Sequence, residues 1–548
     1  MSANYKFKKT LPFEKKNRGL IDTKKPIYNE HISIGNKILM KFSKRPNFIG
    51  QIDAATGKTS TFEQMKERSV KCALWLRKLK VKSGDVITVC THNQLEAYVP
   101  YLAALYIGAI VNPWPKRKKG IRSNAEYFLT RVTPKVIFVD CDNVRMIQAA
   151  VVKMNVSTKI VVFGDGFDEF ESLELILQKK FNRLDINRFS CVKMNIKDTA
   201  IILLSCGTTG FLKDVEVPYT FFLKSSNQIP IMNSNNDVGL WFESLDWTIS
   251  LLLTVRAILL RVKVIKSPGF LEEHHLCQMI QWYKVTWLYL KTDMCNRLSR
   301  FDIFEKYDTS SLKMVIFGGL TIKHNVHISL IQSLPNVSII QLYCLPETGV
   351  IAYQRGTGNI IGSSGYLVTN VRLLIADYAT KEPMGPYTIG VIWCQSPSMM
   401  NGYYKDSRYT RIVIDDNGWF RSEDVGYYDE HGNVFVIDRV KQLINYRHHY
   451  ISPAEIEIAL QSHPLVSEAA VVPLSHDHDN FRLVTFIAPV LGLEQKKELR
   501  KFITETFVGP RRLKYIYYMK QLPHISDEII NRKRLSKLAI NHTDVAWL

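Results

Sequence analysis

The sequence lacks paired cysteines. Its nine cysteines are an odd number scattered over 548 residues, and none of them forms a CxxC pair. Zinc sites and secreted disulfide frameworks use closely spaced or evenly paired cysteines, so this spacing argues against both. A chain of this length buries several hydrophobic cores without cross-links. We therefore expect a protein of a reducing compartment.

Long hydrophobic runs are also missing. The most apolar stretch, Trp247 to Leu260, contains Arg256 and is shorter than the roughly 20 residues of a membrane span, so it predicts a buried helix. The first residues carry positive charge without an apolar core, unlike a secretory signal, and the final residues DVAWL are not an SKL-type peroxisomal address. We expect an intracellular protein, cytoplasmic or peroxisomal, without a transmembrane segment.

Acidic residues are the scarcer charge. The chain has 51 Asp and Glu against 72 Lys and Arg, a formal net charge of +21. Such an excess suits anionic partners, either nucleic acid or small anionic substrates. The basic residues are spread along the chain, the densest run (116–120) is short, and no DNA- or RNA-binding motif accompanies it. No nucleic-acid partner is expected, although charge alone keeps a basic nucleic-acid-binding protein as a minor alternative.

Apolar strands that alternate with helical segments predict an α/β fold with parallel sheets. The strand-like segments are 86–90, 135–140, 159–165, 200–205, 313–319 and 338–344. Two of them run into glycines, at the carboxyl ends where ligands of such sheets bind. From about residue 366 shorter strands and turns predict an antiparallel or barrel-like part, and a small α+β segment follows residue 440.

The strongest motif is SCGTTGFLK at 205–213, directly after an apolar strand. Its two glycines and small hydroxylated residues let backbone N–H groups and hydroxyls converge on an anion, and Lys213 adds a positive charge. A polar turn between strands would explain the same residues, so the segment alone leaves both readings open. The triplet 57–59, GKT, is a turn rather than a P-loop, because Ile52 stands where the earlier glycine is required.

The segment SCGTTGFLK resembles the (S/T)SGTTGxPKG signature of the adenylate-forming enzymes, which include acyl-CoA synthetases, 4-coumarate–CoA ligases and beetle luciferases. Other segments resemble further motifs of this family in the same order, over nearly the whole chain. They are FGGLTI (317–322, family GGAPL), QLYCLPET (341–348, family YGLTE), GWFRSEDVGYYDEHGNVFVIDRVK (418–441, family GWxxTGDxGxxDxxGxxxxxDRxK) and ISPAEIE (451–457, family PxEIE).

The resemblance implies an α/β fold with a large N-terminal AMP-binding domain (1–437), built from two doubly wound sheets and a β-barrel-like subdomain. A hinge (438–445) and a small, mobile α+β C-terminal domain (446–548) would follow. The implied activity joins a fatty or aromatic carboxylic acid to CoA, with ATP and Mg²⁺. The acid attacks the α-phosphate of ATP, the small domain rotates, and the CoA thiol displaces AMP. Positioning and charge stabilisation dominate the first step.

The resemblance also implies residue roles. Lys213, Glu347 and Lys441 would be the catalytic residues, and Glu347 would bind Mg²⁺ through a hard carboxylate oxygen. Asp424 would accept hydrogen bonds from both ribose hydroxyls, and Tyr343 would pack on the adenine. The nucleotide-binding set would comprise Ser205, Gly207, Thr208, Thr209, Gly210, Gly318, Gly319, Tyr343, Thr348, Asp424 and Arg439.

The chain departs from the family pattern near its end. The family motif PxTxxGKI carries a lysine that reaches the active site, but the aligned residues here are Glu528 for the glycine and Ile529 for the lysine. Losing one preorganised donor typically costs roughly 10²–10³ in rate. A cation from the following segment 532–534 (Arg-Lys-Arg) would replace it only by a shift in register.

Further departures fall on ligand-facing positions. Pro346 replaces a threonine and removes both a hydroxyl and a backbone N–H. Asp214 replaces a glycine after the phosphate motif, where it would add negative charge or pair with Lys213. His448 replaces a glycine that lines the CoA tunnel in relatives. Two hypotheses remain: an acid–CoA ligase with weakened catalysis, and a pseudoenzyme that binds a nucleotide or acyl-adenylate.

Overall fold

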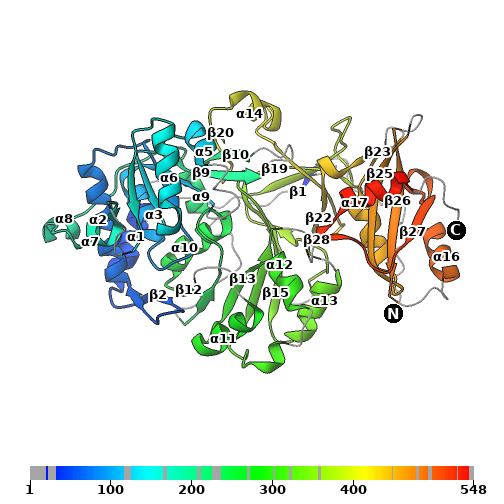
Figure 1. Cartoon of the computed structure of the whole chain (residues 1–548), viewed down its shortest axis with the longest axis horizontal. Coiled ribbons are helices and arrows are strands. Elements are labelled where there is room, and N and C mark those ends of the chain that lie inside the picture. The colour runs from blue at the N-terminus through cyan, green and yellow to red at the C-terminus, as the bar shows by residue number, and fades with distance from the viewer. Residues whose placement is uncertain are drawn as a thin grey trace.

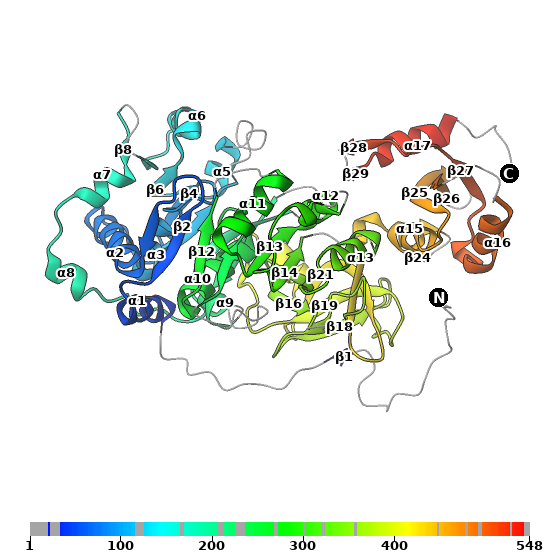
Figure 2. The ribbon, with the colours of Figure 1, turned by 90° about the horizontal axis from the view of Figure 1, so that it is seen from below.

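The computed structural model describes residues 20–21, 33–115, 125–164, 169–206, 212–224, 236–267, 272–299, 303–319, 322, 324–355, 359–446, 449–476, 480–490, 496–526 and 529–541. Figures 1 and 2 show the blue and cyan N-terminal elements packed beside the green middle of the chain. The orange and red C-terminal elements lie at one end of the molecule in both views. The chain thus forms a large body and a smaller C-terminal part.

The first sheet has eight strands in the order β20-β10-β9-β5-β4-β6-β7-β8. Its centre is parallel, whereas β9, β10 and β20 pair in antiparallel fashion at one edge. The strands are β4 (Val86–Cys90), β5 (Ile110–Pro113), β6 (Val136–Val139), β7 (Lys159–Val162), β8 (Glu171–Ser172), β9 (Thr199–Cys206), β10 (Leu212–Pro218) and β20 (Gly402–Tyr403).

The second sheet has nine strands in the order β17-β16-β15-β14-β13-β11-β12-β2-β3, parallel in its middle and antiparallel at both edges. The strands are β2 (Ile49–Asp53), β3 (Thr59–Thr61), β11 (Val238–Leu240), β12 (Lys263–Lys266), β13 (Trp287–Lys291), β14 (Met314–Gly318), β15 (Ser338–Leu345), β16 (Gly349–Tyr353) and β17 (Tyr366–Leu367).

Helices pack against these two sheets, and their boundaries follow local chemistry. Helix α2 begins with a capping box, in which Thr61 and Gln64 satisfy each other's backbone N–H groups. Helices α3 and α10 are apolar around their circumference and almost wholly buried, as the segment from Trp247 predicted. The helices are α1 (Ile34–Lys44), α2 (Phe62–Lys78), α3 (Tyr98–Ile107), α5 (Ala125–Arg131), α6 (Cys141–Lys153), α7 (Leu173–Gln178), α8 (Arg183–Asn187), α9 (Tyr219–Lys224), α10 (Thr248–Leu260), α11 (Glu273–Tyr283), α12 (Thr292–Leu298), α13 (His324–Ser333) and α14 (Ser407–Val413).

The third sheet is antiparallel throughout, with the order β1-β18-β19-β21-β22. It is the part for which the sequence predicted antiparallel or barrel-like structure. Its strands are β1 (Leu20–Ile21), β18 (Arg372–Ala376), β19 (Gly390–Gln395), β21 (Phe420–Tyr428) and β22 (Val434–Arg439). A bulge interrupts the pairing of β19 with β21 between Val391 and Trp393, beside Glu423 and Asp424 of β21.

The C-terminal part begins after a single 3₁₀ turn, η3 (Val440–Gln442), and has its own hydrophobic cores. Helix α15 is capped by Ser452 and starts with Pro453, a residue preorganised for the first helical turn. The elements are β23 (Ile444–Tyr446), β24 (His449–Ile451), α15 (Pro453–Gln461), β25 (Val466–His476), β26 (Asn480–Pro489), α16 (Lys496–Thr506), η5 (Gly509–Arg511), β27 (Tyr515–Tyr518), β28 (His524–Ser526), β29 (Ile529–Ile530) and α17 (Arg532–Asn541).

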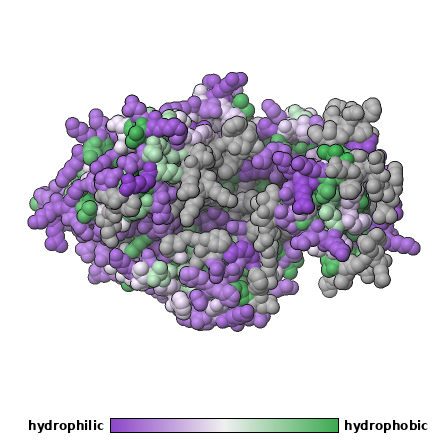
Figure 3. Space-filling view, in the orientation of Figure 1, coloured by the Kyte–Doolittle hydropathy of each residue, from purple (hydrophilic) through white to green (hydrophobic). Residues whose placement is uncertain are grey.

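The predicted fold class is confirmed: two mixed sheets and an antiparallel sheet precede a small α+β part. Hydrophilic residues cover most of the face seen in Figure 3, with hydrophobic residues in scattered patches. Among the described residues, no helix combines the length and apolar content needed to cross a bilayer.

Candidate nucleotide-binding site

Strands β9 and β10 flank the glycine-containing motif and present Lys213 next to Ser205 across the ladder. The Oγ atom of Ser205 is buried and has no hydrogen-bond partner among the described residues. A buried hydroxyl without a partner costs free energy, which a phosphate oxygen at this place would recover. Gly207, Thr208, Thr209 and Gly210 lie outside the described residues.

Lys213 points into a cluster of tyrosines and carboxylates. Its Nζ donates to the Oη of Tyr409 at 2.6 Å, and it lies 4.0 Å from the centre of that ring and 5.3 Å from the centre of Tyr403. Burial lowers the pKa of Lys213, while the nearby carboxylates of Glu423 and Glu347 act in the opposite direction. The lysine is therefore a half-buried cation already surrounded by anions and aromatic rings.

The hydroxyls of both tyrosines donate to carboxylates, and that of Tyr409 also accepts from Lys213. Tyr403 Oη donates to Glu347 Oε1 at 3.2 Å, and Tyr409 Oη donates to Glu423 Oε1 at 2.7 Å. Glu347 is buried at the end of β15, and Tyr409 comes from α14. Segments more than 190 residues apart in sequence, at 213 and 409, thus meet at one place.

Asp424 is the centre of a second cluster. Its Oδ2 accepts a hydrogen bond from Tyr343 Oη at 2.7 Å, and its Oδ1 lies 2.7 Å from Arg439 Nε on the neighbouring strand β22. Burial raises the pKa of Asp424 to about 6, although Arg439 and Tyr343 favour the charged form. A buried acceptor with cationic and hydroxyl partners is suited to exchange one of them for the hydroxyl of a ligand.

Three other predicted residues line the same ends of β14 and β15. A side chain at Gly318 would come within 2.8 Å of the backbone oxygen of Leu342, so glycine is required there. Gly319 has a φ of +111° and open space around it, which leaves its backbone accessible. Thr348 is fully buried, and its hydroxyl donates to the backbone oxygen of Gly349 at 3.3 Å. Lys441 is exposed in the turn η3, between the antiparallel sheet and the C-terminal part.

The structure bears on two alternatives that the sequence left open. Asp214 does not pair with Lys213, because neighbouring residues of a strand face opposite sides, and its carboxylate pairs with Arg131 instead. Arg532 is engaged with the buried Glu457, with Nη2 donating to Oε2 at 2.8 Å, and also donates to the backbone oxygen of Val471. It is therefore held within the C-terminal part. Glu528 and His448 lie outside the described residues.

Sequence reasoning missed Glu423. This residue stands at the glycine of the family pattern TGD and adopts a φ of +60°, a left-handed conformation that favours glycine. The bulge between β19 and β21 accommodates this conformation and interrupts the alternation of side chains, and Glu423 and Asp424 each contact one of the two clusters. The signal was present in the sequence as a charged residue at a motif glycine.

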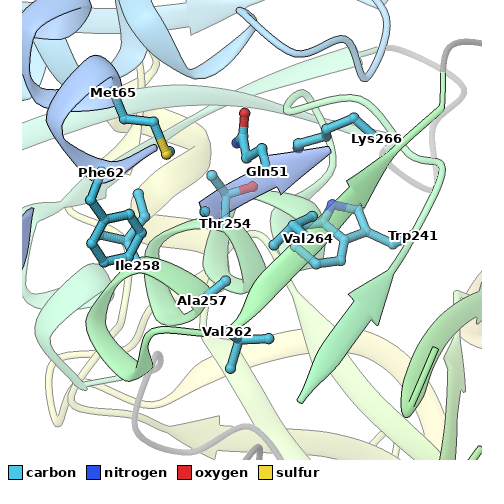
Figure 4. Close-up of a pocket in the computed structure, with 11 residues that line it drawn as sticks. Gln51, Phe62, Met65, Trp241, Thr254, Ala257, Ile258, Val262, Val264 and Lys266 are labelled. Atoms are coloured by element: carbon cyan, nitrogen blue, oxygen red, sulfur yellow. The ribbon is translucent and has the colours of Figure 1, made fainter. Parts of the chain in front are cut away.

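A small cavity lies elsewhere, between helix α2 and strand β12. Figure 4 shows Phe62 and Met65 on one side of it and Trp241 and Lys266 on the other. Its volume is about 10 Å³, enough for one water molecule and too little for a carboxylic acid. The Nζ of the fully buried Lys266 donates to Asn93 Oδ1 at 2.7 Å, and burial lowers the pKa of this lysine to about 7.

The donor atoms fit a magnesium–nucleotide complex better than a protein-only metal centre. In the described part of the chain, no three His, Cys, Asp or Glu residues come together to hold a metal ion. Mg²⁺ is usually bound by one or two carboxylates together with substrate phosphates and water. The buried carboxylate of Glu347, beside Lys213, supplies a donor of that kind.

Known proteins are similar to this chain over most of its length. Residues 39–404 match the model of the AMP-binding enzymes, and residues 455–527 match that of the AMP-binding enzyme C-terminal domain. The chain is 25% identical to 4-coumarate–CoA ligase 4 of Arabidopsis thaliana over 507 residues, which are 89% of this chain and 88% of that protein. It is also 25% identical to the Peroxisomal OPC-8:0-CoA ligase 1 of Arabidopsis thaliana, over 90% of this chain and 91% of that protein.

Solved structures give the same result. The luciferase-like enzyme from the nonluminescent mealworm Zophobas morio is 26% identical and superposes with a TM-score of 0.71, over 78% of this chain and 100% of that chain. ATP-bound MatB from Rhodopseudomonas palustris is 20% identical with a TM-score of 0.79, over 94% of this chain and 99% of the other, and it supports the fold. Both family models match in order along the chain, and the first covers more than half of it. The chain therefore belongs to the AMP-binding, adenylate-forming enzyme family.

Proposed function

We propose that this chain is an AMP-forming ligase that joins a fatty or aromatic carboxylic acid to CoA, with catalysis weakened by changes in its own residues. The observation that carries the proposal is the pairing of Asp424 with Tyr343 and Arg439, next to the cluster of Lys213 and Glu347. One cluster offers acceptors for a ribose and an aromatic ring for a base. The other offers a cation and a carboxylate for a phosphate end.

The roles of the residues follow from their chemistry. Asp424 would accept the ribose hydroxyls, and Tyr343 would lie against the adenine at the glycine edge of β14. Lys213 and the hydroxyl of Ser205 would stabilise negative charge on the phosphates as the acid attacks. Mg²⁺, bound through Glu347, would offset the remaining phosphate charge. Arg439 would lie at the ribose and phosphate edge of the nucleotide, and Lys441 would lie at the hinge about which the small domain rotates.

We also propose the domain division 1–437, 438–445 and 446–548. It is supported by the short turn η3 between β22 and β23, and by the separate hydrophobic cores on either side of it. CoA would be the acyl acceptor, as the names of the plant relatives say of those proteins. A peroxisomal or cytoplasmic location remains part of this proposal.

The second candidate function is nucleotide or acyl-adenylate binding without turnover. Ile529 favours it, because an aliphatic side chain cannot donate a hydrogen bond to a developing phosphate charge. Arg532 favours it as well, since its guanidinium is engaged by Glu457 and cannot replace the missing donor without breaking that pair.

ATP–pyrophosphate exchange separates the two candidates. The purified protein would be assayed with Mg²⁺ and a panel of short, long and cinnamic acids, beside Ile529→Lys and the uncharged control Ile529→Met. We expect weak exchange by the natural chain and a rise of roughly 10²-fold in the lysine variant alone. Exchange absent from all three folded proteins would reject the ligase and leave binding as the function.

A further inference from the structure

Glu423 occupies an unfavourable backbone conformation at the phosphate end of the proposed site. Its φ of +60° lies in the left-handed region, which costs a residue with a side chain about 1 kcal/mol or more. Such strain persists where the surrounding structure holds it in place, and it gathers at functional sites. Here the bulge between Val391 and Trp393 holds the backbone of Glu423 in place. The carboxylate of Glu423 is directed toward Tyr409 of α14.

That carboxylate is connected to the phosphate-binding lysine. The hydroxyl of Tyr409 donates to Glu423 Oε1 at 2.7 Å and accepts from Lys213 Nζ at 2.6 Å. Lysine, tyrosine and glutamate thus form a continuous chain of charge-assisted hydrogen bonds, which are stronger than neutral ones. A polyphosphate that uses Lys213 must compete with this chain and must approach Glu423.

We infer that Glu423 competes with the phosphates of a nucleotide for Lys213. The site therefore binds an adenosine with a single phosphate, such as AMP or an acyl-adenylate, in preference to ATP. The inference rests on the nucleotide site of the proposed function. ATP carries more negative charge than AMP, and its outer phosphates add repulsion from Glu423 in a half-buried site where screening is reduced. The same competition would weaken adenylation in addition to the loss of the lysine at 529.

Binding of AMP and of ATP, each measured by calorimetry with and without Mg²⁺, tests this. The variants are Glu423→Gln, which removes the charge and keeps the shape, and Glu423→Gly, which also relieves the backbone. Asp416→Asn removes an exposed charge from the turn before β21 and serves as the matched control. Neither change at 423 threatens the fold, since one is isosteric and the other supplies the residue that this conformation favours.

We expect both variants at 423 to bind ATP at least about tenfold more tightly than the natural chain, equivalent to about 1.4 kcal/mol, with a smaller change for AMP. The control should bind both nucleotides as the natural chain does. Equal tightening for AMP and ATP, or no tightening, would overturn the inference while leaving the proposed function in place. If Glu423→Gln bound ATP more weakly than the natural chain, and only when Mg²⁺ was present, Glu423 would be a metal ligand and the inference would be overturned. Failure of every protein to bind either nucleotide would overturn both proposals.

Discussion

Asp424 is a buried carboxyl whose pKa lies within the pH range of a binding experiment. Burial raises its pKa to about 6, and the ionised form is the stronger acceptor for the ribose hydroxyls that we propose it binds. We therefore predict that the affinity for adenosine, which lacks a titrating phosphate, is constant above pH 7 and falls by about tenfold per pH unit below 6. Calorimetric titrations at pH 5, 6 and 8 would measure this.

The same shift has a consequence for folding. The folded chain holds the proton of Asp424 more tightly than the unfolded chain, whose carboxyl has the ordinary pKa of 3.8. Its contribution to stability is thus complete below pH 3.8 and is lost as the pH rises toward 6. Asp424→Asn should abolish this pH dependence of both affinity and stability, and a variant that retained it would show that another group is responsible.

Motif order in the sequence predicted a site formed by Lys213, Glu347, Tyr343, Asp424 and Arg439. The structure brings their side chains into two neighbouring clusters. The contacts between them could not be predicted in the same way. Whether Lys213 bonds to a tyrosine or to the next residue along the strand depends on strand pairing and on a helix almost 200 positions away. Side-chain direction follows from secondary structure, which a motif does not specify.

At the scale of elements, α15 and α17 of the C-terminal part are linked through one ion pair. Glu457 of α15 is buried, and Arg532 at the start of α17 binds both of its oxygens. Removing one partner leaves a buried charge, so Arg532→Ala should destabilise the C-terminal part by about 3 kcal/mol. Chemical denaturation followed by intrinsic fluorescence would measure the loss.

Arg534 offers a matched control, since it is exposed on the same helix. Arg534→Ala should change stability by less than about 0.5 kcal/mol. Equal effects of the two substitutions would mean that helix propensity, rather than the pair with Glu457, determines the result. The proposal that Arg532 is unavailable to the active site would then lose its support.

Elements with clear periodicity were predicted well. The six apolar strands predicted from 86–90 to 338–344 and the buried helix after Trp247 are all present. Strand β1 was missed because two residues, Leu20 and Ile21, carry no period and depend on pairing with β18. The bulge in β21 was missed for a related reason: it is defined by the partner strand as much as by its own residues.

At the scale of the whole molecule, Asp438 connects the two parts of the chain. It belongs to β22, yet its carboxylate accepts hydrogen bonds from Ser452 Oγ at 2.7 Å and from the backbone N–H of Ala454 at 3.2 Å, at the start of α15. Asp438→Ala should therefore release the C-terminal part from a fixed orientation. Small-angle X-ray scattering should show a larger radius of gyration, and limited proteolysis faster cleavage within 438–445.

Glu430→Gln, in the exposed turn between β21 and β22, is the control for removing a negative charge from the same hairpin. Its scattering curve should match that of the natural chain. If Asp438→Ala also matches, other contacts across the hinge, such as the rings of Tyr378 and Tyr450 with centroids 4.1 Å apart, are sufficient to fix the orientation.

Strand order belongs to this scale too, and little of it could be predicted. Alternating strands and helices indicated parallel sheets, but β2 and β3 lie beside β12, and β20 lies beside β10, far from their neighbours in sequence. Such placements depend on which apolar faces cover each other across the large core. The resemblance to a known family supplied the layout that periodicity could not.

Adjacent positions on β22 thus depend on different partners: Arg439 pairs with Asp424 of the proposed nucleotide site, and Asp438 holds the helix of the C-terminal part. This separation bears on how such a chain can diverge. In a lineage that lost nucleotide chemistry, substitutions at 439 would be limited only by the pair with Asp424, whereas those at 438 would still impair assembly of the molecule. Descendants would then show the two neighbours drifting at different rates, and the pair would record whether the chemistry or only the architecture had been under selection.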